Sequence, residues 1–276
     1  MDTTLHHFSL FVDETGTERM LALGSSGDSS QQTVYTAPLT RSPLINSAST
    51  LCLSTYLDTK PTESTAPPAE LAALCERQRT TVSSGISFYQ FHPSSSTLLY
   101  SDSTSLFLLQ ALFLFFNSYF TTSNSCYRKG EKTQEVGSSV NGCPLHAQLC
   151  PVDSSMVAFV ANSNVHIDWR GELIFSTVSE DNITNGCCSF VVQEELDRFV
   201  GMWWSPGPRK MLLYERVDET QVTSLQLTIP GCAPTPPMKY PIAGTANAIS
   251  TLRLIHIDEN TVTDTGLLTE LKSVYP

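Results

Sequence analysis

Charged residues are scarce in this sequence, and basic residues are the scarcest of them. Only 16% of the 276 residues are charged, and 16 Lys and Arg stand against 27 Asp and Glu, which gives a formal net charge of −11. Because binding to nucleic-acid phosphates needs a basic surface, this balance argues against DNA or RNA as the main partner. An acidic surface suits a cationic ligand, although solubility alone accounts for it equally well.

A long hydrophobic run and a secretory leader are also missing. The longest apolar stretch, residues 106–116, is interrupted by Gln110 and is shorter than the roughly 20 residues that a membrane-spanning helix needs. The chain opens with Met-Asp-Thr-Thr-Leu-His-His, which has neither a basic start nor an apolar core before a cleavage site. We therefore expect a soluble, cytoplasmic protein that does not enter a membrane.

The 8 cysteines follow no regular spacing, so in a cytoplasmic protein they are expected to be reduced thiols. Cys143, His146 and Cys150 invite a zinc interpretation, but a tetrahedral site needs further ligands, and no second Cys/His pair lies at a suitable spacing. We expect no metal and no cofactor. The neighbours Cys187 and Cys188 are expected to be two thiols on opposite faces of a strand, because a vicinal disulfide would be strained.

Apolar residues, 41% of the chain, are divided among many short segments. Segments typical of strands recur from residue 7 to residue 258 and are joined by short polar turns. Residues 42–68, rich in Ser, Thr, Pro and Ala, predict a loop, and residues 69–79, which follow two prolines, predict the one helix. The pattern predicts an all-β fold, whether a sandwich, a barrel or a series of propeller blades.

Several blocks of residues resemble, in the same order, those of the cytosolic (8/9-type) branch of the dipeptidyl peptidase IV family. The blocks are 77–79 (Arg-Gln-Arg), 85–92 (Gly-Ile-Ser-Phe-Tyr-Gln-Phe-His), 149–153 (Leu-Cys-Pro-Val-Asp), 193–198 (Gln-Glu-Glu-Leu-Asp-Arg), 201–204 (Gly-Met-Trp-Trp) and 239–247 (Lys-Tyr-Pro-Ile-Ala-Gly-Thr-Ala-Asn). The resemblance covers roughly residues 77–276. It implies a truncated β-propeller at 69–276, with the first propeller strands at 1–41 and the loop at 42–68 between them.

In this family a β-propeller is followed by an α/β-hydrolase domain that holds a Ser-Asp-His triad. The sequence contains no Gly-x-Ser-x-Gly nucleophile elbow, so the hydrolase domain is expected to be absent, and we assign no catalytic residue. The resemblance implies the substrate-gating propeller portion of a cytosolic serine dipeptidyl aminopeptidase, inactive alone, whose intact form removes N-terminal dipeptides that end in Pro or Ala. The alternative is a stand-alone, non-catalytic propeller that binds peptides or proteins.

Glu194 and Glu195 are the candidate substrate-binding residues, because in the family the corresponding pair grips the free amino terminus of a peptide. An ammonium group has only donors, so two converging carboxylates satisfy it with charge-assisted hydrogen bonds. For an arbitrary pair of glutamates, a solvated acidic loop is the default interpretation. The matching blocks on both sides favour the functional one. Peptides with a free amino terminus are the expected partners, and a homodimer of the full-length protein is left open.

Arg79 matches, within one residue of register, a family arginine that hydrogen-bonds a substrate carbonyl, a task suited to a planar guanidinium. A cation interacting with the end of a helix is the alternative. Asp197 and Arg198 are expected to support the glutamate segment structurally. Strand alternation is expected to bury one of Trp203 and Trp204 in the core and to leave the other at a blade surface.

Residues 108–125 depart from the family pattern, which passes directly from the Ser-Leu-Phe strand to a turn with a cysteine. We hypothesise that this oily segment is a gene-model error such as retained intron sequence. A peptide joining Phe107 to Cys126, detected by mass spectrometry, would support the hypothesis. A peptide lying wholly inside the segment would refute it.

Overall fold

A computed structural model describes residues 3–13, 15–26, 31–39, 53–57, 66–82, 84–102, 104–110, 132–178, 180–226, 237–259 and 261–266 of the chain. Two compact units are present. Unit 1 consists of Met1–Ala72 and Thr81–Val136, and unit 2 consists of Ala73–Thr80 and Gly137–Pro276.

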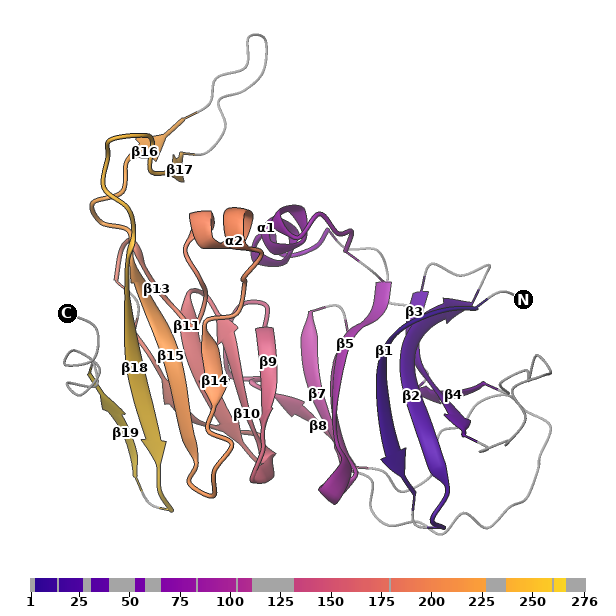
Figure 1. Cartoon of the computed structure of the whole chain (residues 1–276). Coiled ribbons are helices and arrows are strands. Elements are labelled where there is room, and N and C mark those ends of the chain that lie inside the picture. The colour runs from indigo at the N-terminus through magenta and orange to yellow at the C-terminus, as the bar shows by residue number, and fades with distance from the viewer. Residues whose placement is uncertain are drawn as a thin grey trace. The chain divides into compact units, whose positions relative to one another are not determined.

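Unit 1 is built around one 8-stranded, mostly antiparallel sheet (Figure 1). Its strands are β1 (Thr3–Val12), β2 (Glu18–Ser26), β3 (Gln31–Pro38), β4 (Ser54–Leu57), β5 (Ser84–His92), β6 (Thr97–Asp102), β7 (Ser105–Gln110) and β8 (Lys132–Val136). Strands β5 to β8 form a simple meander, each pairing with the next, and a short 3-10 helix, Pro93–Ser95, turns the chain between β5 and β6. The only parallel pairing among the described strands joins β3 to β5 over Gln31↔Ser84 and Gln32↔Gly85.

The core of unit 1 comes from side chains that alternate along these strands, as expected for sheets with one buried face. The buried cluster consists of Leu21, Leu23, Val34, Ile86, Tyr89, Leu98, Tyr100 and Leu109. Tyr89 is fully buried, and its hydroxyl lies 2.8 Å from the carbonyl oxygen of His7 and 3.0 Å from that of Leu21. The ring therefore fills the core while its polar tip remains hydrogen-bonded.

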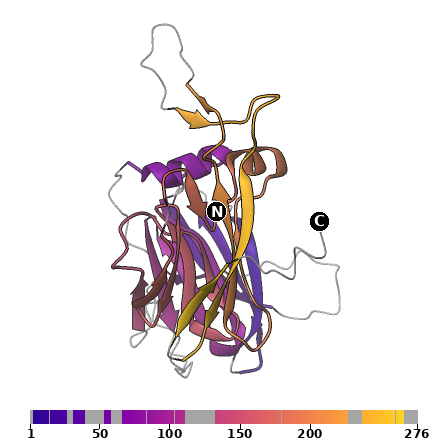
Figure 2. The ribbon, with the colours of Figure 1, turned by 90° about the vertical axis from the view of Figure 1, so that its left-hand side faces the viewer.

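The described residues of unit 2 form two larger sheets, two helical segments and a small ribbon. The first sheet has the order β12-β11-β10-β9 and is formed by β9 (Leu145–Cys150), β10 (Asp153–Ala161), β11 (Asn164–Trp169) and β12 (Glu172–Ser176). The second is formed by β13 (Ile183–Asn185), β14 (Met202–Trp204), β15 (Met211–Asp218), β18 (Ile249–Ile257) and β19 (Val262–Thr265). The ribbon of β16 (Ser224–Leu225) and β17 (Met238–Lys239) projects beyond the second sheet (Figure 2).

The two sheets of unit 2 share one hydrophobic core. Residues from both sheets meet in it, namely Cys150, Met156, Ala158, Val160, Val165, Ile167, Met202, Leu212, Tyr214, Ile255 and Ile257. Trp204 packs against this cluster, and its ring N–H donates to the carbonyl of Gln148 at 3.2 Å. Successive antiparallel meanders whose sheets pack on one another are the architecture of propeller blades. The fold is all-β and corresponds to a partial β-propeller, as predicted.

Several elements differ in detail from the prediction. The expected helix is present as α1 (Ala69–Arg77), but a second helix, α2 (Phe190–Leu196), occupies a segment whose Phe-Val-Val start is typical of a strand. Strand β4 lies inside the expected loop at 42–68. Residues 108–110 of the doubtful insert belong to β7, where Leu108 and Leu109 are buried, and residues 111–125 lie outside the described part of the chain. Of the helices described, none is long and apolar enough to cross a membrane.

Candidate functional site

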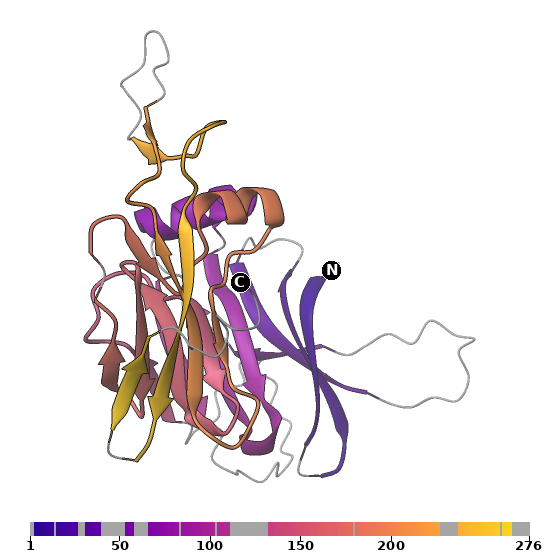
Figure 3. The same cartoon turned by 60° about the vertical axis from the view of Figure 1, so that its left-hand side comes forward.

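One strand of the second sheet in unit 2 is interrupted, and the interruption carries α2. Both β13 and β14 pair with β15, β13 opposite residues 216–218 and β14 opposite residues 212–214. Residues 186–201 therefore leave the sheet after β13 and re-enter it at β14. Helix α2 and the last turn of α1 lie side by side beyond the end of the sheet (Figure 3).

The interrupting segment leaves and returns at a single point, marked by Gly186 and Gly201. The amide of Gly186 donates to the carbonyl of Glu215 at 2.8 Å, and the amide of Glu215 donates to the carbonyl of Gly201 at 2.7 Å. The amide of Gly201 also donates to the carbonyl of Gly186 at 2.9 Å, and Cys187 forms an isolated bridge with Val200. Residues 186–201 therefore form an excursion from the sheet. The two ends of this excursion are hydrogen-bonded to each other and to β15, and this junction is the base of the excursion.

Chains approach closely around both glycines at this base. Gly186 has a φ of +79°, and a Cβ there would lie 2.6 Å from a methyl carbon of Val165 and 2.8 Å from one of Val160. A Cβ at Gly201 would lie 3.1 Å from backbone atoms of Cys187. A side chain at Gly186 would force the core beneath it to shift, and one at Gly201 would be in tight contact with the backbone of Cys187.

Helix α2 is short, and Gln193 is its one buried residue, with 6% of its surface exposed. Both ends of its side-chain amide are used. Its Nε2 donates to the carbonyl of Cys188 at 2.6 Å, and its Oε1 accepts from Nη1 of Arg77 at 2.9 Å. A helix of this length does not persist in water unaided, so it depends on such tertiary contacts.

The start of α2 is held by charged groups from two other elements. The guanidinium of Arg77 lies 5.4 Å from the ring centroid of Phe190, within cation–π range. The carboxylate of Glu219, which follows β15, accepts the backbone N–H of Phe190, while Ser189 at the N-cap position makes no side-chain cap. Burial raises the pKa of Glu219, and this backbone hydrogen bond and the nearby cations Lys239 and Arg77 oppose the rise.

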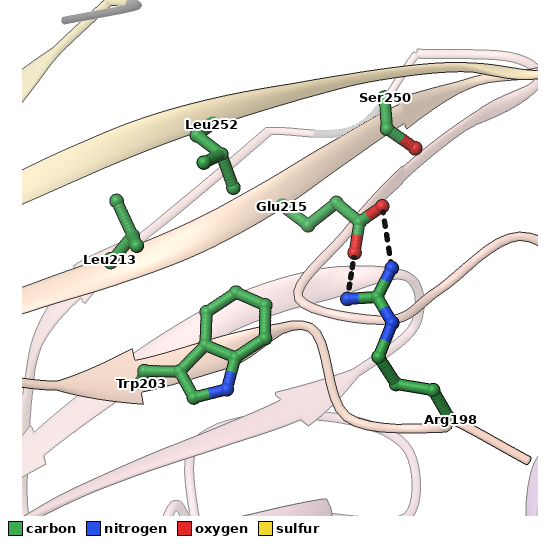
Figure 4. Close-up of a pocket in the computed structure, with 6 residues that line it drawn as sticks. All are labelled: Arg198, Trp203, Leu213, Glu215, Ser250 and Leu252. Carbon is green, nitrogen blue, oxygen red and sulfur yellow. Dashed lines mark hydrogen bonds and ion pairs between the residues drawn. The ribbon is translucent and has the colours of Figure 1, made fainter. Parts of the chain in front are cut away.

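The end of the excursion is held by an ion pair between Arg198 and Glu215 (Figure 4). Nη1 of Arg198 lies 2.9 Å from Oε2 of Glu215, a carboxylate that is only 3% exposed. The thiol of Cys188 lies 3.6 Å from the same oxygen, and burial, followed by the negative charge of Glu215, raises its pKa to about 12. Cys188 is therefore a protonated, unreactive thiol, and Cys187 beside it is likewise not in a disulfide.

Glu194 and Glu195 are both exposed on α2. Within the described part of the chain, neither carboxylate has a hydrogen-bond or ion-pair partner. They are anionic groups, acceptors only, carried by a backbone that is fixed by contacts on both sides. The arrangement can bind a cation that brings its own hydrogen-bond donors.

Arg79 follows α1 and is exposed. It has a φ of +53° in the left-handed region, where its N–H donates to the carbonyl of Glu76 and the next N–H, of Thr80, donates to that of Cys75. This is the helix-ending arrangement that usually employs glycine, so an arginine there is conformationally costly. Its side chain contacts neither glutamate. Arg77, two residues earlier on α1, does reach α2.

Beside the Arg198–Glu215 pair lies an open pocket of about 400 Å³, lined by Arg198, Trp203, Leu213, Glu215, Ser250 and Leu252 (Figure 4). Trp203 is 39% exposed there, whereas Trp204 packs on the core, so alternation separates the two tryptophans as predicted. Asp197, in the left-handed conformation, ends α2 and does not pair with Arg198.

The zinc interpretation gains no support from the geometry. In the described ranges, no group of three or more His, Cys, Asp and Glu side chains could hold a metal ion. His146 instead has a pKa lowered to about 4 by burial, which keeps its ring neutral.

Sequence comparison agrees with this architecture. Residues 115–274 match the family described as Dipeptidyl peptidase IV (DPP IV) N-terminal region. The chain belongs to this family. It is 25% identical to dipeptidyl peptidase 8 of Mus musculus over 284 residues, which cover 91% of this chain and 30% of the mouse protein. It is 24% identical to dipeptidyl peptidase 8 of Homo sapiens over 273 residues, which cover 89% of this chain and 29% of the human protein.

The chain therefore spans less than a third of the length of these relatives. The family match includes the whole of the interrupted strand, α2 and the Arg198–Glu215 pair. The excursion of residues 186–201 therefore lies within the part of the chain that matches the dipeptidyl peptidase IV N-terminal region.

Proposed function

We propose that Glu194 and Glu195 bind the α-amino group of a peptide substrate. In this proposal the chain is the propeller portion of a cytoplasmic serine dipeptidyl peptidase, and it admits and aligns the peptide. The observation that carries the proposal is a pair of exposed carboxylates that have no partner among the described residues, on a helix held at its start by Arg77 and after its end by Arg198. Membership of the dipeptidyl peptidase IV N-terminal family supports it.

The chemistry of the pair favours an ammonium group over other cations. Two adjacent carboxylates supply several acceptor oxygens on one short helix, and an ammonium supplies only donors, so each charge-assisted hydrogen bond finds its complement. A peptide whose amine is acetylated has no charge there and leaves both carboxylates unpaired. The pair therefore selects free amino termini.

Arg79 completes the proposed site from the end of α1. Its guanidinium is exposed and has no partner in the part of the chain that the structure describes, so it can donate to a carbonyl of the bound peptide. Its left-handed backbone conformation, where glycine would be less strained, supports a role for the side chain itself. In the intact protein, binding the amine at a fixed place sets how many residues reach the scissile bond, and the separate hydrolase domain cleaves there.

The test compares two fluorescent peptides that begin with Gly-Pro and differ only in acetylation of the amino terminus. The chain of 276 residues should bind the free-amine peptide at least about tenfold more tightly, equivalent to about 1.4 kcal/mol. Its affinity should fall as the pH rises through about 8, where an α-ammonium loses its proton. Equal affinity for the two peptides would sink the proposal.

A further inference from the structure

Gln193 is an unusual residue to form the buried contact of a helix. It is the one buried side chain of α2, at 6% exposure, in a place where an apolar residue would be simpler to bury. A buried amide is tolerated only when both its donor and its acceptor are satisfied. Here the acceptor is satisfied by Arg77 and the donor by the carbonyl of Cys188.

These two hydrogen bonds fix α2 in two respects. The bond to Cys188 ties the helix to the leg of the excursion that leaves the sheet, and the bond from Arg77 ties it to α1. Successive residues of a helix are turned by about 100° around its axis. Gln193 is buried, and the next two residues, Glu194 and Glu195, are exposed. The rotation of the helix about its axis, which the hydrogen bonds of Gln193 fix, therefore also fixes the directions in which the two glutamates leave the helix.

Arg77 itself is fixed by more than Gln193. Its guanidinium also lies over the ring of Phe190, at 5.4 Å, and Phe190 packs edge-on against Tyr240 at 6.0 Å. The carboxylate of Glu219 holds the N–H of Phe190. The first turn of α2 is thereby clamped to α1, and the clamp acts beside the glutamates without touching them.

We propose that Gln193, held by Arg77, is the positioning residue for the two amine-binding carboxylates; this inference rests on the proposed function. Gln193 does not contact the ligand. It fixes the helix that carries both carboxylates, so that the helix does not have to be ordered when the peptide binds.

The experiment is a double-mutant cycle on the full chain, using the free-amine and acetylated Gly-Pro peptides. Gln193→Met keeps the length of the side chain and removes both hydrogen bonds. It should weaken binding of the free-amine peptide about tenfold and leave binding of the acetylated peptide unchanged. In a chain that already carries Glu194→Gln and Glu195→Gln, the same change should have no further effect on affinity. Gln193 acts only through the two carboxylates, so its contribution disappears once their charges are removed.

A second variant keeps the inference testable if Gln193→Met loses its fold by circular dichroism. Arg77→Met removes the clamp from the α1 side and should reproduce the loss, whereas Arg77→Lys, which retains a donor and the charge, should restore part of it. A folded Gln193→Met or Arg77→Met chain that still binds the free-amine peptide like the parent would overturn the positioning role and leave the proposed function standing. A parent chain that does not distinguish the two peptides would overturn both.

Discussion

The guanidinium of Arg198 and the buried carboxylate of Glu215 meet at 2.9 Å, at the point where the excursion that carries α2 returns to its sheet. Glu215 also closes the base of the excursion through its backbone, by accepting from Gly186 and donating to Gly201. One residue of β15 thus holds the interrupted strand together twice, once through its main chain and once through its side chain.

Removing Arg198 should destabilise unit 2. Arg198→Met leaves a carboxylate that is 3% exposed without its ion-pair partner, and we expect a loss of about 2 kcal/mol in the free energy of unfolding. All 3 tryptophans, at positions 169, 203 and 204, lie in unit 2, so tryptophan fluorescence during urea unfolding reports on this unit. The paired change of Arg198→Met with Glu215→Leu should recover most of the loss. An unchanged unfolding midpoint for Arg198→Met would contradict the role given to the pair.

The glycines at the base of the excursion make a separate prediction. Gly186→Ala places a methyl group 2.6 Å from Val165 at a positive φ, so we expect a loss of about 2 kcal/mol or more in the stability of unit 2. Gly207→Ala is the matched control, because its Cβ would meet nothing closer than 3.6 Å. The urea unfolding midpoints of the two variants should differ clearly; similar midpoints would show that the base of the excursion is not tightly closed.

The stability of unit 2 should depend on the ionisation of His146. Burial lowers the pKa of this ring from 6.5 to about 4, so the unfolded chain takes up a proton at a higher pH than the folded chain does. Stability is therefore lost as the pH falls from about 6.5 to about 4. Asn tolerates the left-handed conformation that His146 adopts, with a φ of +55°, and does not titrate. The difference in unfolding free energy between the parent and His146→Asn should vary across this pH window, and a constant difference would rule out the assignment.

Much of the architecture could be predicted from the sequence because strand alternation and turn residues are local signals. The all-β class, the helix at 69–79 and the separation of Trp203 from Trp204 all follow from such patterns. Helix α2 could not be predicted in this way, since its Phe-Val-Val start favours a strand, and its helical state depends on contacts with Arg77 and Glu219 from distant segments.

In the candidate site, too, some features could be predicted from local sequence and others depend on residues that are distant in the sequence. Glu194 and Glu195 are recognisable from their neighbouring blocks, but the residues that hold them are not. Gln193 carries no signal of its own, because a glutamine beside two glutamates reads as one more solvated residue until its burial is seen. Arg198 pairs with Glu215, which lies on β15 and is 17 residues away in the sequence. The sequence indicated that Arg198 and its neighbour Asp197 support the segment, but it did not identify Glu215 as the partner.

The central claim is that the glutamate pair, and not acidity in general, binds the amine. Its most direct test is isothermal titration of the free-amine Gly-Pro peptide into two variants with the same net charge. One carries Glu194→Gln and Glu195→Gln, and the other carries Asp258→Asn and Glu259→Gln at a second exposed pair of adjacent acids. The account predicts that the first variant loses about tenfold or more in affinity, equivalent to at least about 1.4 kcal/mol, while the second binds like the parent. Equal affinities in the two variants would contradict it.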